Sequence, residues 1–374
     1  MDPQSGGPCQ GIRNSTTAMK KLGVENEVVC LDSPDSHFIS KDDFAIYPLG
    51  PAKRPWSYSP KLIPWLEKNV KNYDAVIVHG LWLYSSYAVE KAMRKVDFPA
   101  WYVMPHGMLD PYFQKAKQRR WKALRNSIYW QFFEKKVINR ACGVLFTTEQ
   151  ELLLARDTFP GYLPRKEINV GYGIQPPEDK STDMLNEFYD AVPDAKDKHL
   201  ILFLGRIHPK KGVDFLVKAF SELNINSHLL VIAGPGKDTE YGRELIQYVS
   251  EKKMNNQVIF PGMLEGLAKW GAFYEADAFI LPSHQENFGI AVAEALACGT
   301  PVLISHKVNI WREIQASGSG FVEPDTLEGT KKLIQSWLGA DANKKKSMNE
   351  KSVNTFKDKF DINTNVQKLI DVLA

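Results

Sequence analysis

Two glutamates eight positions apart, Glu286 and Glu294, have the residue type and the spacing to bind hydroxyl groups. The apolar run Ala278–Pro282 predicts a buried strand, so Glu286 follows its carboxyl end. Glu294 lies one turn past Ile290 in the helix that comes next, on the same helix face. Carboxylates accept hydrogen bonds from hydroxyls such as those of sugars, and we expect both to line one crevice.

The turn Asn287-Phe288-Gly289-Ile290, between that strand and helix, has the properties of an anion site. A helix start presents free backbone N–H groups and the positive end of the helix dipole, and both can hold a diphosphate. The segment continues through Ala297-Cys298-Gly299-Thr300-Pro301, a turn into another strand. The alternative interpretation is two surface glutamates on an ordinary helix.

A basic turn, Gly205-Arg206 to Lys211-Gly212, follows the buried strand His199–Leu204. Two fixed cations at the carboxyl end of a strand can neutralise the charge that grows on a departing diphosphate. The turn is neither a Walker loop nor a GxGxxG fingerprint. Taken alone it is also compatible with a solvated basic turn.

In the first half of the chain, His106-Gly107 ends the strand Ala100–Met104. A lone histidine is more often a hydrogen-bonded structural residue than a catalytic one. His79, which precedes Gly80, is a weaker rival for the same role.

The elements that must position these residues follow a repeated pattern of short apolar runs and helix-like stretches, which predicts parallel sheets built from βα units. Helices are expected at Asp110–Asn139, capped by Asp110 with Pro111 in first position, and at Asp214–Leu223. The expected strands are Glu27–Leu31, Ala75–His79, Ala100–Met104, Gly143–Thr147, Glu167–Val170, His199–Leu204, His228–Ala233, Gln257–Phe260, Ala278–Pro282, Pro301–Ile304 and Gly320–Val322.

A chain of 374 residues suits two domains. We expect a first domain over 1–175, a linker with one short helix over 176–197, a second domain over 198–360 and a last helix, 361–374, that crosses back to the first domain. Ser5-Gly6-Gly7-Pro8 and the amphipathic stretch to Gly23 have the pattern of the loop and helix that follow a first strand. We therefore expect that the first strand is missing.

The composition, 44% hydrophobic and 24% charged, is that of a folded globular protein rather than a disordered one. The four cysteines are scattered, without metal-ligand spacing, which indicates a reducing compartment. No apolar run has the roughly eighteen residues that span a bilayer, and no signal peptide is recognisable. These features predict a cytoplasmic protein.

Bases exceed acids in residues 1–177, and six of them fall between Lys115 and Arg125 without an acid among them. The segment Lys115–Lys136 has two interpretations. Trp121, Leu124, Ile128 and Phe132, at helical spacing, could cover the core. Alternatively the segment contacts an anionic membrane surface, at the inner face of the plasma membrane, or a lipid-linked acceptor. Nucleic acid is not expected, because no recognised binding module surrounds the patch.

The Glu286–Pro301 block resembles the retaining glycosyltransferases of family four, which have the GT-B fold: two Rossmann-like α/β domains that face each other across a cleft. The resemblance implies that Glu294 holds the ribose hydroxyls of a nucleotide and that Glu286 approaches the donor sugar. It assigns the donor phosphates to Arg206 and Lys211, with Lys210 the less favoured neighbour.

In the first domain, the resemblance places His106 opposite the donor sugar and Gly7, with Gly6, in a glycine loop near the diphosphate or the acceptor. The alternative for the glycine pair is a plain turn. Gly234 and Met263 follow strands that frame the nucleotide base in the family, and a purely structural role is equally compatible. Tyr172 stands where many relatives carry asparagine. Any role that the asparagine side chain has in the family is therefore in doubt for this chain.

The resemblance implies a retaining transfer of a hexose from a nucleotide sugar, with UDP-glucose or a similar UDP-hexose favoured, to a saccharide or lipid-linked acceptor in bacterial polysaccharide synthesis. No metal and no cofactor are expected, because the chain lacks an Asp-x-Asp at a strand end. The alternatives are a GT-B epimerase or phosphorylase, a glycosidase that uses Glu286 and Glu294 as acid and base, and a non-catalytic sugar-nucleotide-binding protein.

Overall fold

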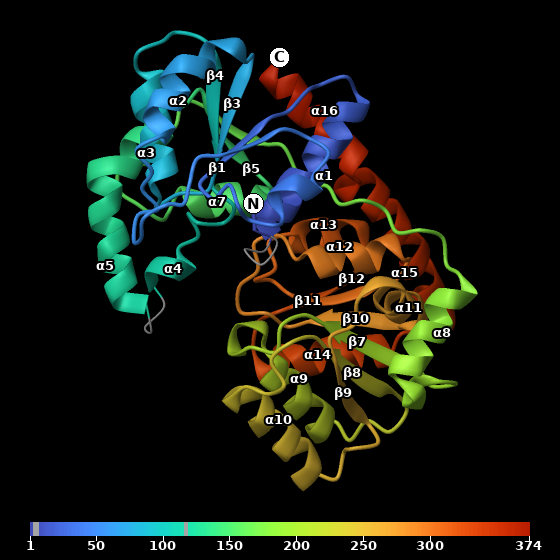
Figure 1. The fold of residues 1–374 in the computed structure, drawn as a ribbon. Helices are drawn as coiled ribbons and strands as arrows, with labels where there is room; N and C mark the ends of the chain where they lie inside the picture. Colours follow the sequence, from blue (N-terminus) through green and yellow to red (C-terminus); the bar gives the residue numbers. More distant parts are fainter. Residues whose placement is uncertain (3–6, 116–118) are drawn as a thin grey trace. The chain divides into compact units, whose positions relative to one another are not determined.

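The computed structural model describes residues 1–2, 7–115 and 119–374. They form two compact units (Figure 1): one is Met1–Gly173 with Ile362–Ala374, and the other is Ile174–Asp361. Each unit is an α/β structure whose paired strands run parallel, as the apolar pattern predicts.

The second unit contains one sheet with the strand order β12-β11-β10-β7-β8-β9. The chain begins in the middle at β7, moves outward to β9, returns to β10 beside β7 and then moves outward on the other side. This is a doubly wound sheet with its switch point between β7 and β10. Its strands are β7 Leu200–Leu204, β8 Leu229–Ala233, β9 Val258–Gly262, β10 Ala278–Leu281, β11 Val302–Ser305 and β12 Gly320–Glu323.

The helices of the second unit connect these strands. Several begin at a side-chain cap, such as Thr239 and Thr326, whose hydroxyl accepts a hydrogen bond from the backbone three residues on. They are α8 Thr182–Ala191, α9 Val213–Glu222, α10 Glu240–Glu251, α11 Gly266–Glu275, α12 Ile290–Ala297, α13 Trp311–Ser317, α14 Leu327–Leu338 and α15 Ala342–Thr355.

Helix α8 falls within the predicted linker. It packs so closely on α11 that a Cβ atom on Gly271 would lie 2.1 Å from the carbonyl oxygen of Met184. The segment 182–191 is therefore part of the second unit.

The first unit has two separate sheets, one with the order β3-β4-β5-β6 and one with β1 beside β2. The structure has all eleven strands that the sequence predicts, with ends that shift by at most two residues. It adds β2, which is short and ends in a proline that cannot donate to a ladder. The strands are β1 Val28–Cys30, β2 Ile46–Pro48, β3 Ala75–His79, β4 Ala100–Met104, β5 Gly143–Phe146 and β6 Glu167–Asn169.

The helices of the first unit include α16, from the end of the chain, which packs beside α1. They are α1 Gly7–Lys21, α2 Leu62–Asn69, α3 Tyr84–Met93, α4 Tyr112–Lys115, α5 Arg120–Tyr129, α6 Lys135–Arg140, α7 Glu149–Ala155 and α16 Ile362–Leu373.

The prediction of one continuous helix over Asp110–Asn139 is confirmed for residues 120–139, which are helical throughout, although residues 130–134 form a π-helical turn. Asp110 does cap the start, since its Oδ1 accepts from the Tyr112 N–H at 2.8 Å. However, α4 ends at Lys115, and a π-helical turn, Trp130–Glu134, separates α5 from α6. No proline or glycine lies between Tyr112 and Asn139. The interruption at the π turn instead accompanies the burial of Trp130 and Glu134 in the core, which local sequence does not reveal.

A cavity of about 610 Å³ lies inside the first unit, between β1 and β3. Apolar side chains of α1, α2, α3 and α16 complete its wall, among them Met19, Leu66, Val89 and Leu369.

Among the helices of the described residues, none is long and apolar enough to cross a bilayer.

Candidate functional site

The two segments singled out in the second half of the sequence follow β7 and β10, the strands on either side of the switch point. Ligands of doubly wound sheets bind at the carboxyl ends of such strands. The segments touch, because the His284 N–H donates to the Lys210 carbonyl at 2.9 Å. Gly212, with φ of 67°, lies so close that a Cβ atom would stand 2.3 Å from the Pro282 oxygen.

Glu286 and Lys211 form an ion pair between these two segments. Their side chains are 21% and 18% exposed, so the pair lies at the surface of the sheet edge but is largely shielded. The backbone of Glu286 is fixed on both sides: its N–H donates to the Lys307 carbonyl at 2.9 Å, and its carbonyl accepts from Asn309 at 3.0 Å. A carboxylate and a cation therefore stand together at a rigid position.

Glu294, inside α12, pairs with Lys269 of α11 at 2.9 Å. The Lys269 ammonium also lies 3.9 Å from the ring centre of Trp270, a cation–π geometry. The sequence gives no sign of Lys269, because no spacing rule connects it to a residue 25 positions away in another helix. Each of the two glutamates thus has its own lysine.

The turn before α12 has the expected form. Gly289 caps the helix in the left-handed conformation with φ of 83°, and a Cβ atom there would lie 3.1 Å from Val308. Ile290 is the first helical residue, next to Asn287 and Phe288 in the turn. Phe288 is buried edge-on against Phe360, with ring centres 5.5 Å apart. Its side chain therefore anchors the turn.

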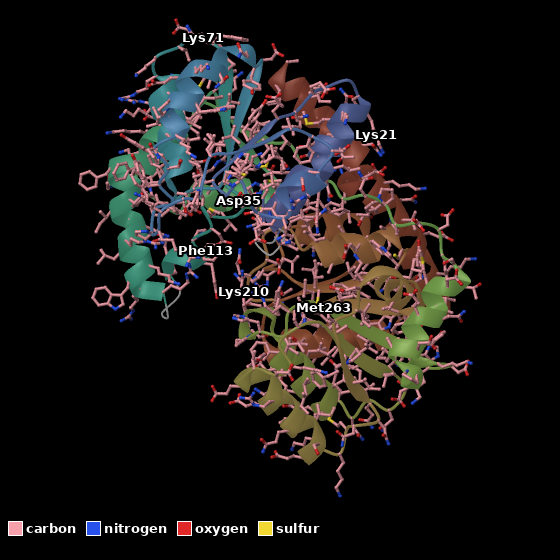
Figure 2. All side chains as sticks on the ribbon, in the orientation of Figure 1. Lys21, Asp35, Lys71, Phe113, Lys210 and Met263 are labelled. Carbon is pink, nitrogen blue, oxygen red and sulfur yellow. The ribbon has the colours of Figure 1, made fainter. Side chains whose placement is uncertain are left out.

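Three further residues predicted for the donor site lie at the same edge of the sheet, after β7, β8 and β9. Arg206 is exposed and forms no hydrogen bond or ion pair with any residue that the structure describes. Met263 is 62% exposed (Figure 2). Gly234 has φ of 137°, and a Cβ atom there would lie 2.0 Å from the Gly205 carbonyl. Only glycine fits that position, so the structural interpretation of Gly234 is sufficient.

His106, in the first unit, lies beside His79, with Nε2 and Nδ1 2.9 Å apart. The two histidines, which the sequence offers as alternatives for one role, are neighbours because β3 pairs with β4 in parallel, with His79 opposite Met104. Burial lowers the pKa of His79 to about 4. Burial and the neighbouring imidazole lower the pKa of His106 to about 3, so both rings are neutral at pH 7. The following turn is held by Glu151, whose carboxylate accepts from the Gly107 N–H at 2.5 Å.

The Tyr172 side chain contacts the first turn of α1. Its hydroxyl donates to the Gly7 carbonyl at 3.1 Å, and a Cβ atom on Gly11 would lie 2.6 Å from the same hydroxyl oxygen. Gly7 is the first residue of α1, whereas Gly6 lies outside the described residues. The tyrosine thus fastens the helix that follows the glycine pair.

The basic, aromatic segment presents an apolar face to solvent. Trp121 is 85% exposed, and Leu124, Ile128 and Phe132 are 54, 53 and 65% exposed. The interpretation that these residues cover the core is wrong, since Trp130 and Val137 do so instead. Lys117 lies outside the described residues.

One group of potential metal ligands lies on the opposite edge of the second sheet, at the amino ends of β7, β8 and β10. It comprises His199, His228 and Asp277, whose ligand atoms lie within 4.8 Å of one another. Glu286, in contrast, follows the carboxyl end of β10. The histidine and aspartate group therefore lies at the other end of the strands from the candidate site.

Comparison with known proteins agrees with this geometry. The profile of the family described as glycosyl transferases group 1 matches residues 186–354, and that of the glycosyl transferase 4-like domain matches residues 6–170. An uncharacterised glycosyltransferase of Methanocaldococcus jannaschii is 29% identical over 240 residues, which are 56% of this chain and 60% of the relative. The chain spans less than two thirds of the length of the curated relatives that it matches.

Solved structures show the same fold. Sucrose-phosphate synthase from Thermosynechococcus elongatus has a TM-score of 0.71 at 22% identity, covering 98% of this chain and 92% of that one. Anabaena HepE in complex with UDP-glucose has a TM-score of 0.74 at 15% identity, covering 98% and 96%. The fold is therefore GT-B.

Proposed function

We propose, from the premise that this chain belongs to the group 1 glycosyltransferases, that it is a retaining, metal-independent hexosyltransferase that uses a nucleotide sugar. The observation that carries the proposal is the pair of shielded contacts Lys211–Glu286 and Lys269–Glu294 at the switch point of the second sheet. An anionic sugar donor requires one carboxylate that binds the nucleotide and one that binds the sugar, with cations beside them. This site contains such groups.

In this proposal Glu294 accepts hydrogen bonds from the ribose hydroxyls, and its contact with Lys269 orients its carboxylate. Glu286 contacts the hydroxyls of the donor sugar. Lys211 and Arg206, with the N–H groups at the start of α12, stabilise the diphosphate as the glycosidic bond breaks. Exposed Arg206 is available to a phosphate without first breaking an ion pair.

Retention follows when the leaving phosphate oxygen takes the proton of the acceptor hydroxyl on the face that the diphosphate leaves. The new bond to the anomeric carbon then forms on the side where the old one broke. In the first unit, neutral His106 contributes a ring or backbone dipole rather than a charge, because its pKa is lowered to about 3. Its partner His79 fixes the ring orientation.

UDP-glucose or a similar UDP-hexose is the favoured donor. The fold match to a protein solved with UDP-glucose supports this choice. We place the reaction in bacterial polysaccharide assembly, with a saccharide or lipid-linked saccharide as acceptor.

The binding of a panel of UDP- and GDP-hexoses tests the donor, by calorimetry on the purified chain, followed by proton NMR of the transfer product. We expect one UDP-hexose to bind and the anomeric configuration to be kept. Failure of every sugar nucleotide to bind would refute the proposal. Binding without hydrolysis or transfer would favour a non-catalytic binding protein, conversion of the bound sugar to its epimer would favour an epimerase, and cleavage of aryl glycosides without nucleotide would favour a glycosidase.

The exposed face of α5 supports a contact with the inner face of the plasma membrane. Trp121, Leu124 and Ile128 of α5 are exposed together with Phe132 of the π-helical turn that follows it, and exposed Arg120, Lys122 and Arg125 accompany them. Residues 111–133 contain no acid. Apolar insertion and attraction to anionic lipid act together on such a helix, at about 1 kcal/mol per base near the surface.

Sedimentation with vesicles tests this contact. We expect the chain to bind vesicles that contain phosphatidylglycerol and not vesicles of phosphatidylcholine alone, and the double variant Trp121→Ser/Phe132→Ser to bind at least about tenfold more weakly. Leu163→Ser is the matched control, because Leu163 is 73% exposed in the same unit but outside α5. Equal losses in both variants would contradict a specific contact.

A further inference from the structure

Two histidines and an aspartate gather at the edge of the second sheet that lies opposite the turns with Lys211 and Glu286. His199, His228 and Asp277 each stand one residue before a strand, namely β7, β8 and β10. These three strands are neighbours in the order β10-β7-β8 (Figure 1). One potential metal ligand therefore stands at the amino end of each strand in a row of three.

The ligand atoms of this group are nearly as close together as one metal ion requires. One atom from each residue lies within 4.8 Å of the other two. His199 Nδ1 is 3.3 Å from Asp277 Oδ2 and 3.4 Å from Oδ1, whereas an N–H···O hydrogen bond usually measures about 2.9 Å. Ligands at about 2.1 Å from a tetrahedral Zn²⁺ stand roughly 3.4 Å apart. The separation of the imidazole and the carboxylate therefore matches coordination to one ion.

Neighbouring groups already orient two of the three ligands. Asp277 Oδ2 accepts a hydrogen bond from the Leu200 N–H at 2.7 Å, and the Asp277 N–H donates to the Leu200 carbonyl at 2.9 Å. Ser227 Oγ lies 2.8 Å from His228 Nδ1, which leaves Nε2 of that ring for a metal. Metal-binding histidines and carboxylates are usually held by such hydrogen bonds to a second layer of residues. The arrangement around Asp277 and His228 is therefore that of a prepared site.

His199 completes the group from the solvent side. Its side chain is 71% exposed, and its ring stacks on that of His228 with ring centres 5.2 Å apart. Its backbone belongs to the sheet, because the His199 carbonyl accepts from the Leu229 N–H at 2.8 Å. Exposed side chains change rotamer within nanoseconds. A rotation of this imidazole can therefore bring its nitrogen to a shared ion, and solvent can supply a fourth ligand.

The types of ligand select the metal. Two imidazoles and one carboxylate suit Zn²⁺ and its first-row neighbours, whereas Mg²⁺ and Ca²⁺ prefer oxygen ligands alone. Zn²⁺ sites with three protein ligands and one water are common, and they include sets of two histidines and one carboxylate. The group at the amino ends of β7, β8 and β10 has the same composition.

We propose that His199, His228 and Asp277 bind one Zn²⁺ ion, with water as the fourth ligand. The ion links the amino ends of β8, β7 and β10, and the last two of these strands flank the switch point of the sheet. It lies at the opposite end of the strands from the proposed donor site, so it takes no part in glycosyl transfer. Its role is to stabilise the second unit, because a ligand that binds only the folded state raises the free energy of unfolding.

Calorimetric titration of the purified 374-residue chain with ZnCl₂, after treatment with EDTA and dialysis, tests the proposal. We expect one saturable site for Zn²⁺ and none for Mg²⁺. His199→Ala and Asp277→Asn should each weaken Zn²⁺ binding at least about tenfold, and Ser227→Ala should weaken it about tenfold. Both ligand variants are expected to fold, since the His199 side chain is exposed and asparagine still offers an oxygen to the Leu200 N–H.

His306→Ala is the matched control. His306 also stands beside an aspartate of the second unit, with its Nε2 3.9 Å from Asp325 Oδ1, but it follows the carboxyl end of β11. This variant should bind Zn²⁺ with the affinity of the parent chain. Thermal unfolding without metal checks that all variants are folded.

Two further measurements locate the ion and report its geometry. Zn²⁺ at about a hundredfold excess over Kd should raise the Tm of the parent chain by about 3 °C or more. It should also slow amide exchange at Leu200 and Leu229 at least about tenfold, while exchange in Ala75–His79 stays unchanged. Co²⁺ bound in place of Zn²⁺ should show the strong visible absorption of tetrahedral coordination, and Asp277→Asn should remove it.

Three results would overturn the proposal: no saturable binding of Zn²⁺, equal affinity in the parent chain and both ligand variants, or a larger loss in His306→Ala than in those variants. The weak absorption of octahedral Co²⁺ would overturn coordination by three protein ligands and one water. None of these measurements involves glycosyl transfer, so their failure would leave the proposed function standing.

Discussion

The two units wind their chains by the same scheme but differ at the centre of the sheet. In the second unit, β7 is buried and the turn after it carries Arg206 and Lys211. In the first, the corresponding position is a cavity between β1 and β3. The comparison teaches that a central strand does two things at once: it completes the core, and its carboxyl end carries the turn on which the ligand site is built.

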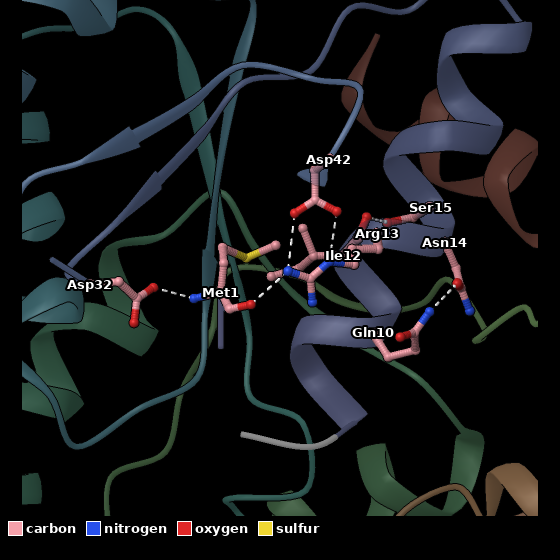
Figure 3. A network of polar contacts seen from close by, with 8 residues as sticks. All are labelled: Met1, Gln10, Ile12, Arg13, Asn14, Ser15, Asp32 and Asp42. Atoms are coloured by element: carbon pink, nitrogen blue, oxygen red, sulfur yellow. Dashed lines mark hydrogen bonds and ion pairs between the residues drawn. The ribbon is translucent and has the colours of Figure 1, made fainter. Parts of the chain in front are cut away.

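The units also differ in how they hold charge. The second balances each glutamate of its site with a lysine. The first also has shielded ion pairs, such as Arg13 with Asp42 (Figure 3), but in addition it buries His79 with His106, and Glu134, whose Oε2 has no hydrogen-bond partner among the described residues. We therefore expect catalysis to depend on the second unit's pairs, and pH-dependent stability to arise in the first.

The largest expected effect is on catalysis in the second unit. Glu286→Ala should lower the rate of transfer by about 10³-fold while donor affinity changes little, because Glu286 contacts the sugar as charge develops. Glu294→Ala should weaken donor binding by about 10- to 100-fold, the worth of charged hydrogen bonds. Turnover and calorimetry together separate the two. Glu328→Ala, on the exposed surface of the same unit, is the control, and equal effects of both site variants would contradict the assigned roles.

A glycine in each unit tests how tightly its backbone is packed. Gly234→Ala should destabilise the protein by about 3 kcal/mol or more, because a Cβ atom would overlap the Gly205 carbonyl at an unfavourable φ. Gly23→Ala in the first unit should cost only about 1 kcal/mol, since its φ is also positive but nothing stands within 4 Å. Urea denaturation measures both. Similar losses would show that φ alone decides the cost.

Acid should destabilise the first unit through its histidine pair. Both folded pKa values, about 4 for His79 and about 3 for His106, lie below the ordinary 6.5. Protonation therefore favours the unfolded chain, so this contribution to stability is complete above pH 6.5 and falls as the pH drops toward 4. We expect a loss of about 2.5 kcal/mol between pH 7 and 5.5 that His79→Asn/His106→Asn removes. Exposed His37→Asn is the control and should keep the loss.

The smallest expected effect is that of Glu134, whose contribution to stability falls as the pH rises, whereas that of the histidine pair falls as the pH drops. Burial raises the pKa of Glu134 to about 7, although Ser86 and the Trp82 N–H both donate to its carboxylate. Its stability contribution is complete below the unfolded value of 4.5 and is lost as the pH rises through 7. Glu134→Gln should therefore stabilise the protein by about 1 kcal/mol at pH 8.5 and less at pH 5.5. Thermal unfolding at pH 5.5 and pH 8.5 measures the gain in stability. A gain that is independent of pH would argue against titration of Glu134.

The sequence by itself determined the strands, because continuous apolar runs bounded by turns have few other folded forms. It also identified Gly289 as a turn residue and placed Glu286, Arg206 and Lys211 after strands, since these are consequences of local order along the chain. The resemblance that rests on these residues led to the correct family.

Only the tertiary structure decided the pairing of these residues. The contacts of Glu294 with Lys269 and of His106 with His79 join residues 25 and 27 positions apart, and they depend on which strands and helices become neighbours. The exposure of Trp121 was likewise hidden, because helical spacing shows that a face is apolar but not what it faces. The cavity between β1 and β3 has the same origin: it is a property of how strands are ordered in a sheet, which no local segment encodes.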